Sequence, residues 1–104
     1  MARAIEISVW RPHNGKFDEF VQVYKKLRVA FLELGVSDVE IITGAAGKDV
    51  GNVVVIQHWK GLAENGALNE AANNHPAMAK FREENPGNFP ADLISHDLYQ
   101  EIED

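Results

Sequence analysis

Apolar and polar positions along this chain follow two different periods. Positions 5–9 alternate between apolar and other side chains, which predicts a strand at the beginning of the chain. Apolar runs at 39–42 and 53–59 predict two more strands, and the turn-rich stretch 44–52 between them predicts a hairpin. A fourth strand is predicted at 93–99. The third run is apolar at successive positions, which indicates burial on both faces.

The segments between these strands have helical spacing. The stretch 17–34 predicts a helix that ends at Gly35. Small residues predict a second helix over 62–74, and the break at His75-Pro76 separates it from a further helical piece that ends at residue 84. The first helix has one apolar stripe at steps of three and four residues: Phe17, Phe20, Val21, Tyr24, Leu27, Phe31 and Leu34.

The order of these elements is βαββαβ. It predicts an α+β, ferredoxin-like fold with a four-stranded antiparallel sheet. A chain of 104 residues suits one domain, so we expect residues 1–104 to form a single unit.

Composition excludes several classes of function. Sixteen acidic residues against ten basic ones give a net charge of -6, and no basic cluster is present, so a nucleic-acid-binding protein is not expected. No apolar run approaches the ~18 residues of a membrane span, and nothing resembles a signal peptide, so we expect a cytoplasmic protein. Cysteine is absent, which excludes disulfides, thiolate metal sites and cysteine nucleophiles.

Two longer segments resemble a known superfamily. These are EISVWRPHNGKFDEFVQVYKKL, and VVVIQHWKGLAENGALNEAANNHPAMAKF with its tryptophan and broken helix. They are similar to the dimeric α/β-barrel proteins, as in the antibiotic-biosynthesis-monooxygenase-like and NIPSNAP-like families. The resemblance implies a homodimer in which two four-stranded sheets pack face to face, so that each sheet covers the other. Members include cofactor-independent quinone-forming monooxygenases, muconolactone isomerase-like enzymes, haem proteins and proteins without an assigned activity.

The haem-degrading members would have an asparagine on the first strand and a histidine on the second helical segment. Here the first strand carries Glu6 and Ser8, although His75 lies near the expected helical position. Haem is therefore not supported, and we expect no cofactor. The four histidines also lack the short spacing of a metal site, so no bound metal is expected.

The resemblance implies the strand order 4-1-3-2, from which we assign the two faces of the sheet by strict alternation. We expect the more apolar face to meet the helices and the other face to line the dimer barrel. The first face carries Ile5, Ile7, Val9, Val54, Ile56, His58, Ile94, His96 and Leu98. The second face carries Glu6, Ser8, Trp10, Val53, Val55, Gln57, Trp59, Ser95, Asp97 and Tyr99.

His58 and His96 interrupt this apolar face and are the predicted catalytic residues. Two strands apart, they would lie at least ~9–10 Å from each other, which is too far to chelate one metal but suits the two sides of a small ligand. Either could act as a general base near neutral pH or hydrogen-bond a substrate carbonyl or phenol. Alternatively, each is a core or rim residue with a satisfied hydrogen bond.

Four further residues are predicted to contact a ligand: Tyr24, Phe31, Trp59 and His75. Each has a structural alternative, because Tyr24 and Phe31 fit the core stripe, Trp59 fits a dimer interface and His75 fits an exposed helix start. Glu6, a carboxylate within a strand, either pairs across the dimer with Arg3 or Arg11 or has an acid–base role.

The sequence thus predicts a homodimeric protein that binds a small apolar or aromatic molecule in a pocket between helices and sheet. It could act as a cofactor-independent monooxygenase-like or isomerase-like enzyme. The alternative is a non-catalytic dimerisation or interaction domain.

Overall fold

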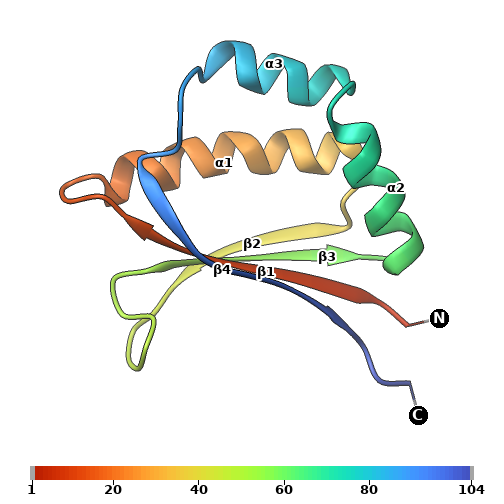
Figure 1. The fold of residues 1–104 in the computed structure, drawn as a ribbon, viewed down its shortest axis with the longest axis horizontal. Coiled ribbons are helices and arrows are strands. Elements are labelled where there is room, and N and C mark those ends of the chain that lie inside the picture. Colours follow the sequence, from red (N-terminus) through yellow and green to blue (C-terminus); the bar gives the residue numbers. More distant parts are fainter. Residues whose placement is uncertain (1, 104) are drawn as a thin grey trace.

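A computed structural model describes residues 2–103 of the chain. Figure 1 shows a layer of strands with the helices stacked above it. The elements, in chain order, are β1 (Ala4–Pro12), α1 (Phe17–Leu34), β2 (Asp38–Thr43), β3 (Val53–Trp59), α2 (Leu62–Ala72), α3 (Pro76–Glu84) and β4 (Ala91–Gln100). This order confirms the predicted α+β, ferredoxin-like arrangement, with the second helix broken in two.

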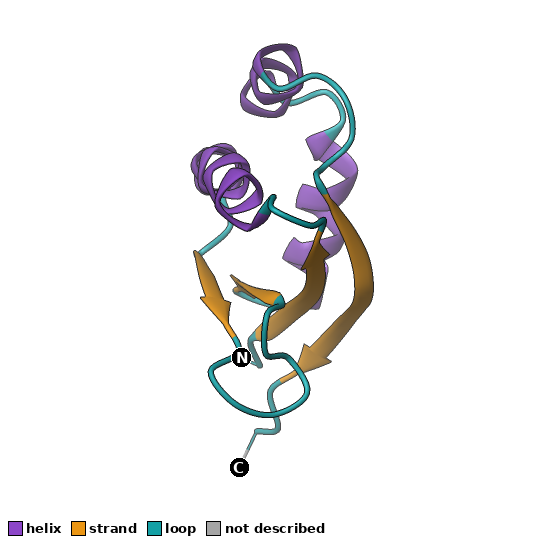
Figure 2. Ribbon diagram, turned by 90° about the vertical axis from the view of Figure 1, so that its left-hand side faces the viewer, coloured by secondary structure: helices purple, strands orange, loops and turns teal. Residues whose placement is uncertain are grey.

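The four strands form one antiparallel sheet in the order β2-β3-β1-β4. This is the strand order that the resemblance implied. The helices lie on one side of the sheet, and α3 lies above α1 as an outer layer (Figures 1 and 2). Within the described protomer, the other side of the sheet has no helical cover. None of the helices within residues 2–103 is long and apolar enough to cross a membrane.

Local signals explain where the helices begin and end. The predicted stripe of α1 is turned inward, and Phe20, Tyr24 and Leu27 are among its buried residues. Gly35 ends the helix with a φ of 122°, a left-handed conformation that glycine adopts without a Cβ clash. At the start of α3, the His75 Nδ1 atom accepts a hydrogen bond of 3.1 Å from the backbone N–H of Ala77. His75 is therefore the N-cap of α3.

The predicted assignment of the two sheet faces is wrong. On β3 the residues that enter the helix-side core are Val53, Val55 and Trp59, which had been assigned to the dimer barrel. The isoleucines Ile5 and Ile7 lie on the opposite, uncovered face instead. Apolar content misled the assignment, because Glu6 and Ser8 face the helices and find hydrogen-bond partners there.

The position of β4 relative to β1 also differs from the prediction. His96 pairs with Ser8 and Leu98 pairs with Glu6, so both β4 residues share the helix-side face. His58 pairs with Ile5 and lies on the uncovered face. The prediction that His58 and His96 share one face is therefore wrong. Alternation within a strand does not fix its register against a neighbour, and here the β1–β4 register also shifts between Val9 and Trp10.

Candidate functional site

A nearly buried carboxylate on the central strand β1 organises the polar groups between sheet and helices. The Glu6 side chain is only 12% exposed. Its Oε1 atom accepts a hydrogen bond of 2.8 Å from the Asn65 side-chain amide of α2. Its Oε2 atom forms a very short contact with the His96 Nε2 atom of β4. Residues from three elements, far apart in sequence, thus meet at one carboxylate, and we call Glu6 and His96 the interior dyad.

This geometry selects one form of the neutral imidazole. An ionised carboxylate can only accept hydrogen bonds, so the His96 Nε2 atom carries the proton that it donates to Glu6. The lone pair then lies on the Nδ1 atom. The His96 side chain is 52% exposed, so the imidazole ring is partly open to solvent. A histidine oriented in this way by a carboxylate has the arrangement of a general base.

A second polar chain lies beside the interior dyad, because Ser8 pairs with His96 across the two strands. The Trp10 indole N–H donates a hydrogen bond of 3.0 Å to the Ser8 hydroxyl oxygen. Burial raises the pKa of the Tyr24 hydroxyl well above its usual range; the hydrogen bond with Ser8 opposes this rise, and the charge of Glu6 adds to it. Tyr24 therefore remains a neutral phenol at physiological pH and can act as a hydrogen-bond donor or acceptor.

An aromatic cluster continues from this chain towards the surface. The Trp10 and Phe89 rings lie 5.3 Å apart, and the Tyr24 and Phe89 rings stack at 6.0 Å between centroids. Phe89 and Phe81 also line a surface hollow of about 350 Å³ beside the loop between α3 and β4. This volume falls within the range of small-molecule sites. A planar molecule in the hollow would contact rings that belong to the same cluster as Tyr24.

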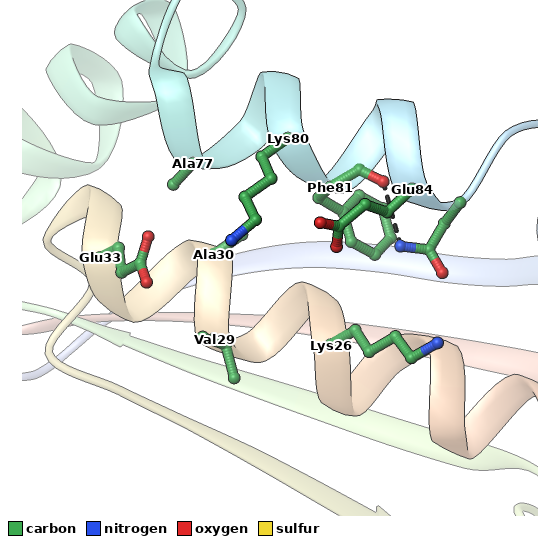
Figure 3. Close-up of a pocket in the computed structure, with 9 residues that line it drawn as sticks. Lys26, Val29, Ala30, Glu33, Ala77, Lys80, Phe81 and Glu84 are labelled. Atoms are coloured by element: carbon green, nitrogen blue, oxygen red, sulfur yellow. Dashed lines mark hydrogen bonds between the residues drawn. The ribbon is translucent and has the colours of Figure 1, made fainter.

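A separate hollow of about 210 Å³ lies between α1 and α3. Figure 3 shows Lys80 extending from α3 towards Ala30 of α1, with Glu33 nearby on α1. Neither Glu6 nor His96 lines this hollow. It marks a loosely packed junction between the two helices, apart from the dyad.

Among the predicted site residues, the structure places His96 and Tyr24 on the helix side, near Glu6 and Ser8. His58 lies on the uncovered face, where its Nε2 atom is 2.8 Å from the Glu40 Oε2 atom. These two residues line another hollow of about 550 Å³ with Arg3 and Lys60, among others. His58 is therefore on the far side of the sheet from the interior dyad.

Two of the remaining predicted ligand contacts have structural roles, whereas Trp59 is a core residue that also lines the hollow beside His58. Phe31 packs against the core, and His75 caps α3. Trp59 is 1% exposed and belongs to the helix-side core, so its alternative as an interface residue is wrong. Within residues 2–103 its indole nitrogen has no hydrogen-bond partner.

Sequence reasoning missed Asn65 and misplaced the partner of Glu6. The carboxylate pairs within its own protomer, whereas Arg3 bonds to Glu101. The available signal was an asparagine among small residues in a helix interior, where asparagine is less favourable than alanine unless its amide has a partner. No group of three or more histidine or carboxylate side chains within residues 2–103 could hold a metal ion.

Known proteins resemble this chain in fold only. No protein-family model matches it, and no curated protein is detectably similar to it in sequence. A NIPSNAP domain protein from Burkholderia xenovorans superposes with a TM-score of 0.68 at 16% identity, over 97% of this chain and 94% of that one. SnoaB, a cofactor-independent oxygenase from Streptomyces nogalater, superposes with a TM-score of 0.65 at 12% identity, over 98% of this chain and 95% of SnoaB. An antibiotic biosynthesis monooxygenase-like protein from Chloroflexus aurantiacus superposes with a TM-score of 0.61 at 12% identity, over 98% of this chain and 95% of that one. These likenesses show that the chain shares the fold of these proteins.

Proposed function

We propose that this protein binds a small apolar or aromatic molecule on the helix side of the sheet and removes a proton from it with His96. The observation that carries this proposal is the interior dyad, in which Glu6 contacts the Nε2 atom of the half-exposed His96 side chain and leaves the Nδ1 atom as its basic nitrogen. Tyr24 is the proposed hydrogen-bonding partner of a substrate oxygen. The catalytic role thus stays with His96, and His58 has no part in this chemistry.

The surroundings favour a substrate with a flat apolar body and a weakly acidic C–H or O–H group. Trp10, Tyr24 and Phe89 provide aromatic surface beside the polar groups. Leu98, on the same face as His96, is 48% exposed and adds apolar surface at its side. The charge of Glu6 stabilises the imidazolium that forms when Nδ1 accepts the proton.

Proton abstraction is the first step shared by the two reactions that we consider, isomerisation and cofactor-independent oxygenation. In isomerisation the proton returns to a different carbon of the same molecule. In oxygenation the carbanion passes its electron pair to O₂ and forms a C–O bond, and the resulting peroxide anion takes the proton back from the His96 imidazolium to give a hydroperoxide. The fold-level likeness to a cofactor-independent oxygenase favours testing oxygen uptake as well as exchange.

The test uses 2-tetralone, a bicyclic ketone with acidic C–H groups, in D₂O. We expect the protein to accelerate exchange at the carbon between ring and carbonyl, as followed by proton NMR, while an oxygen electrode detects any uptake. His96→Gln should lose at least about 100-fold of the acceleration, since general bases contribute typically 10²–10⁴-fold. Equal rates for His96→Gln and the unmodified protein would refute the role of the dyad, and His58→Gln is the matched control.

The second candidate function is that of a homodimerisation or interaction domain, supported by the uncovered face of the sheet. This face carries Ile5, Ile7 and Ile56, which are only half buried in the protomer. We propose that a second copy covers it, as the resemblance to dimeric α/β-barrel proteins implies. The two functions are compatible, because the dyad and the uncovered face lie on opposite sides of the sheet.

A further inference from the structure

A third surface feature, unrelated to the dyad, lies between α1 and the edge strand β2. It is a hollow of about 250 Å³ with an apolar lining that includes Phe17 and Val21 of α1 and Ile41 and Ile42 of β2. Phe17 is 38% exposed, and Ile41 packs against the helix-side core. Ile42 pairs with Val54, so its side chain lies on the uncovered face of the sheet. The large apolar side chain of Phe17 therefore remains partly open to solvent at this hollow, beside the helix-side core.

Two cations, Lys25 and Arg28, also line this hollow. They are three positions apart on α1, so they project from the same side of the helix. Within residues 2–103 neither has an ion pair or side-chain hydrogen bond, whereas Lys16, the N-cap residue of α1, pairs with Glu19 at 3.3 Å. Among the described residues, two cations without an ion pair thus lie at the same apolar hollow.

We propose that this hollow binds a small amphipathic carboxylate. The carboxylate group would lie between Lys25 and Arg28, where a guanidinium and an ammonium can both donate charge-assisted hydrogen bonds. The apolar body would cover Phe17 and Ile41. A volume of about 250 Å³ accommodates roughly ten non-hydrogen atoms at ~20–30 Å³ each, which suits an aryl or short alkyl acid.

The probe for this site is 4-phenylbutyrate, compared with its neutral amide at the same concentration. We expect a Kd on the order of 1 mM for the acid, because it has about a dozen non-hydrogen atoms and each contributes the binding free energy typical of a small ligand. Backbone amide signals of residues 17–28 and 41–43 should shift in two-dimensional NMR. The amide should bind at least about tenfold more weakly. Added salt should lower the affinity for the acid and leave the affinity for the amide unchanged.

A double variant, Lys25→Gln with Arg28→Gln, should lower the affinity for the acid at least about tenfold. Glutamine matches lysine and arginine in helix propensity, so the fold is retained. Lys26→Gln, which changes the hollow between α1 and α3 instead, is the matched control and should bind as the unmodified chain does.

Three results would overturn the proposal. The first is equal affinity for the amide and the acid, and the second is an unchanged affinity of the double variant for the acid. The third is a loss of affinity in Lys26→Gln equal to that in the double variant. Shifts at these residues that depend on protein concentration rather than on 4-phenylbutyrate would assign the hollow to a second copy of the chain and overturn it as well.

Discussion

His58 and His96 lie on opposite faces of one sheet, and each holds a carboxylate through its Nε2 atom. His58 bonds to Glu40 on the uncovered face, and His96 bonds to Glu6 on the helix side. The strand β1 separates β3 from β4, so the two pairs share no side chain. Two imidazoles of similar local chemistry therefore occupy different environments, one at the proposed dimer face and one beside the aromatic cluster.

This separation predicts that the two histidines respond independently. Glu40→Ala should shift the ring nitrogen signals of His58 and leave those of His96 unchanged, while Glu6→Gln should have the reverse effect. Long-range nitrogen–proton NMR correlation reads the tautomer of each ring. In the unmodified protein at neutral pH we expect His96 with its proton on Nε2, and a proton on Nδ1 would contradict the assigned base.

The Asn65 amide is predicted to stabilise the fold because it partners a nearly buried carboxylate. Asn65→Ala leaves Glu6 Oε1 without that donor, so the free energy of unfolding should fall by about 1–3 kcal/mol. The control is Asn69→Ala, an exposed position of the same helix, where alanine is neutral or slightly stabilising. Urea unfolding measures both, and equal effects would show that the Asn65 hydrogen bond contributes nothing.

Tyr24 should make stability depend on pH at alkaline values. Its pKa is raised in the folded state, chiefly by burial, so unfolded chains lose the phenol proton first as pH rises above about 10. The folded state then binds more protons, and stability falls as pH rises from there. Tyr24→Phe should flatten this decline in urea unfolding between pH 9 and 11. Tyr99→Phe, at a half-exposed position, keeps Tyr24 and is the control.

Most of the fold could be predicted from local patterns. The stripe of α1 and its end at Gly35 followed from spacing and backbone freedom, and the break before Pro76 followed from proline sterics. Each of these signals involves residues that are close together in the sequence, so it can be recognised without knowledge of the tertiary structure.

The faces of the sheet could not be predicted, because they depend on partners far along the chain. Glu6 and Ser8 were assigned to the face of the dimer barrel, but they face the helices, where Asn65 satisfies the first, and Trp10 and Tyr24 satisfy the second. Both faces of such a sheet can be apolar when each has a cover, so apolar content does not distinguish them. His96 and Tyr24, two of the predicted site residues, lie between helices and sheet, on the face first assigned to the dimer; their role in binding a ligand stays a prediction.

The uncovered face of the sheet predicts that the chain self-associates. Ile7 and Ile56 pair at adjacent strand positions on that face. Ile7→Lys would place an ammonium group there, and burying it against a second sheet would cost more than the contact contributes. We expect the unmodified chain to sediment as a dimer of two 11.6 kDa subunits and the Ile7→Lys variant to sediment as a monomer. Val29→Lys, on the 56% exposed Val29 side chain of α1, should leave the dimer intact. A monomeric unmodified chain at tens of micromolar in analytical ultracentrifugation would remove the proposed cover, and the half-buried isoleucines would then need a different partner.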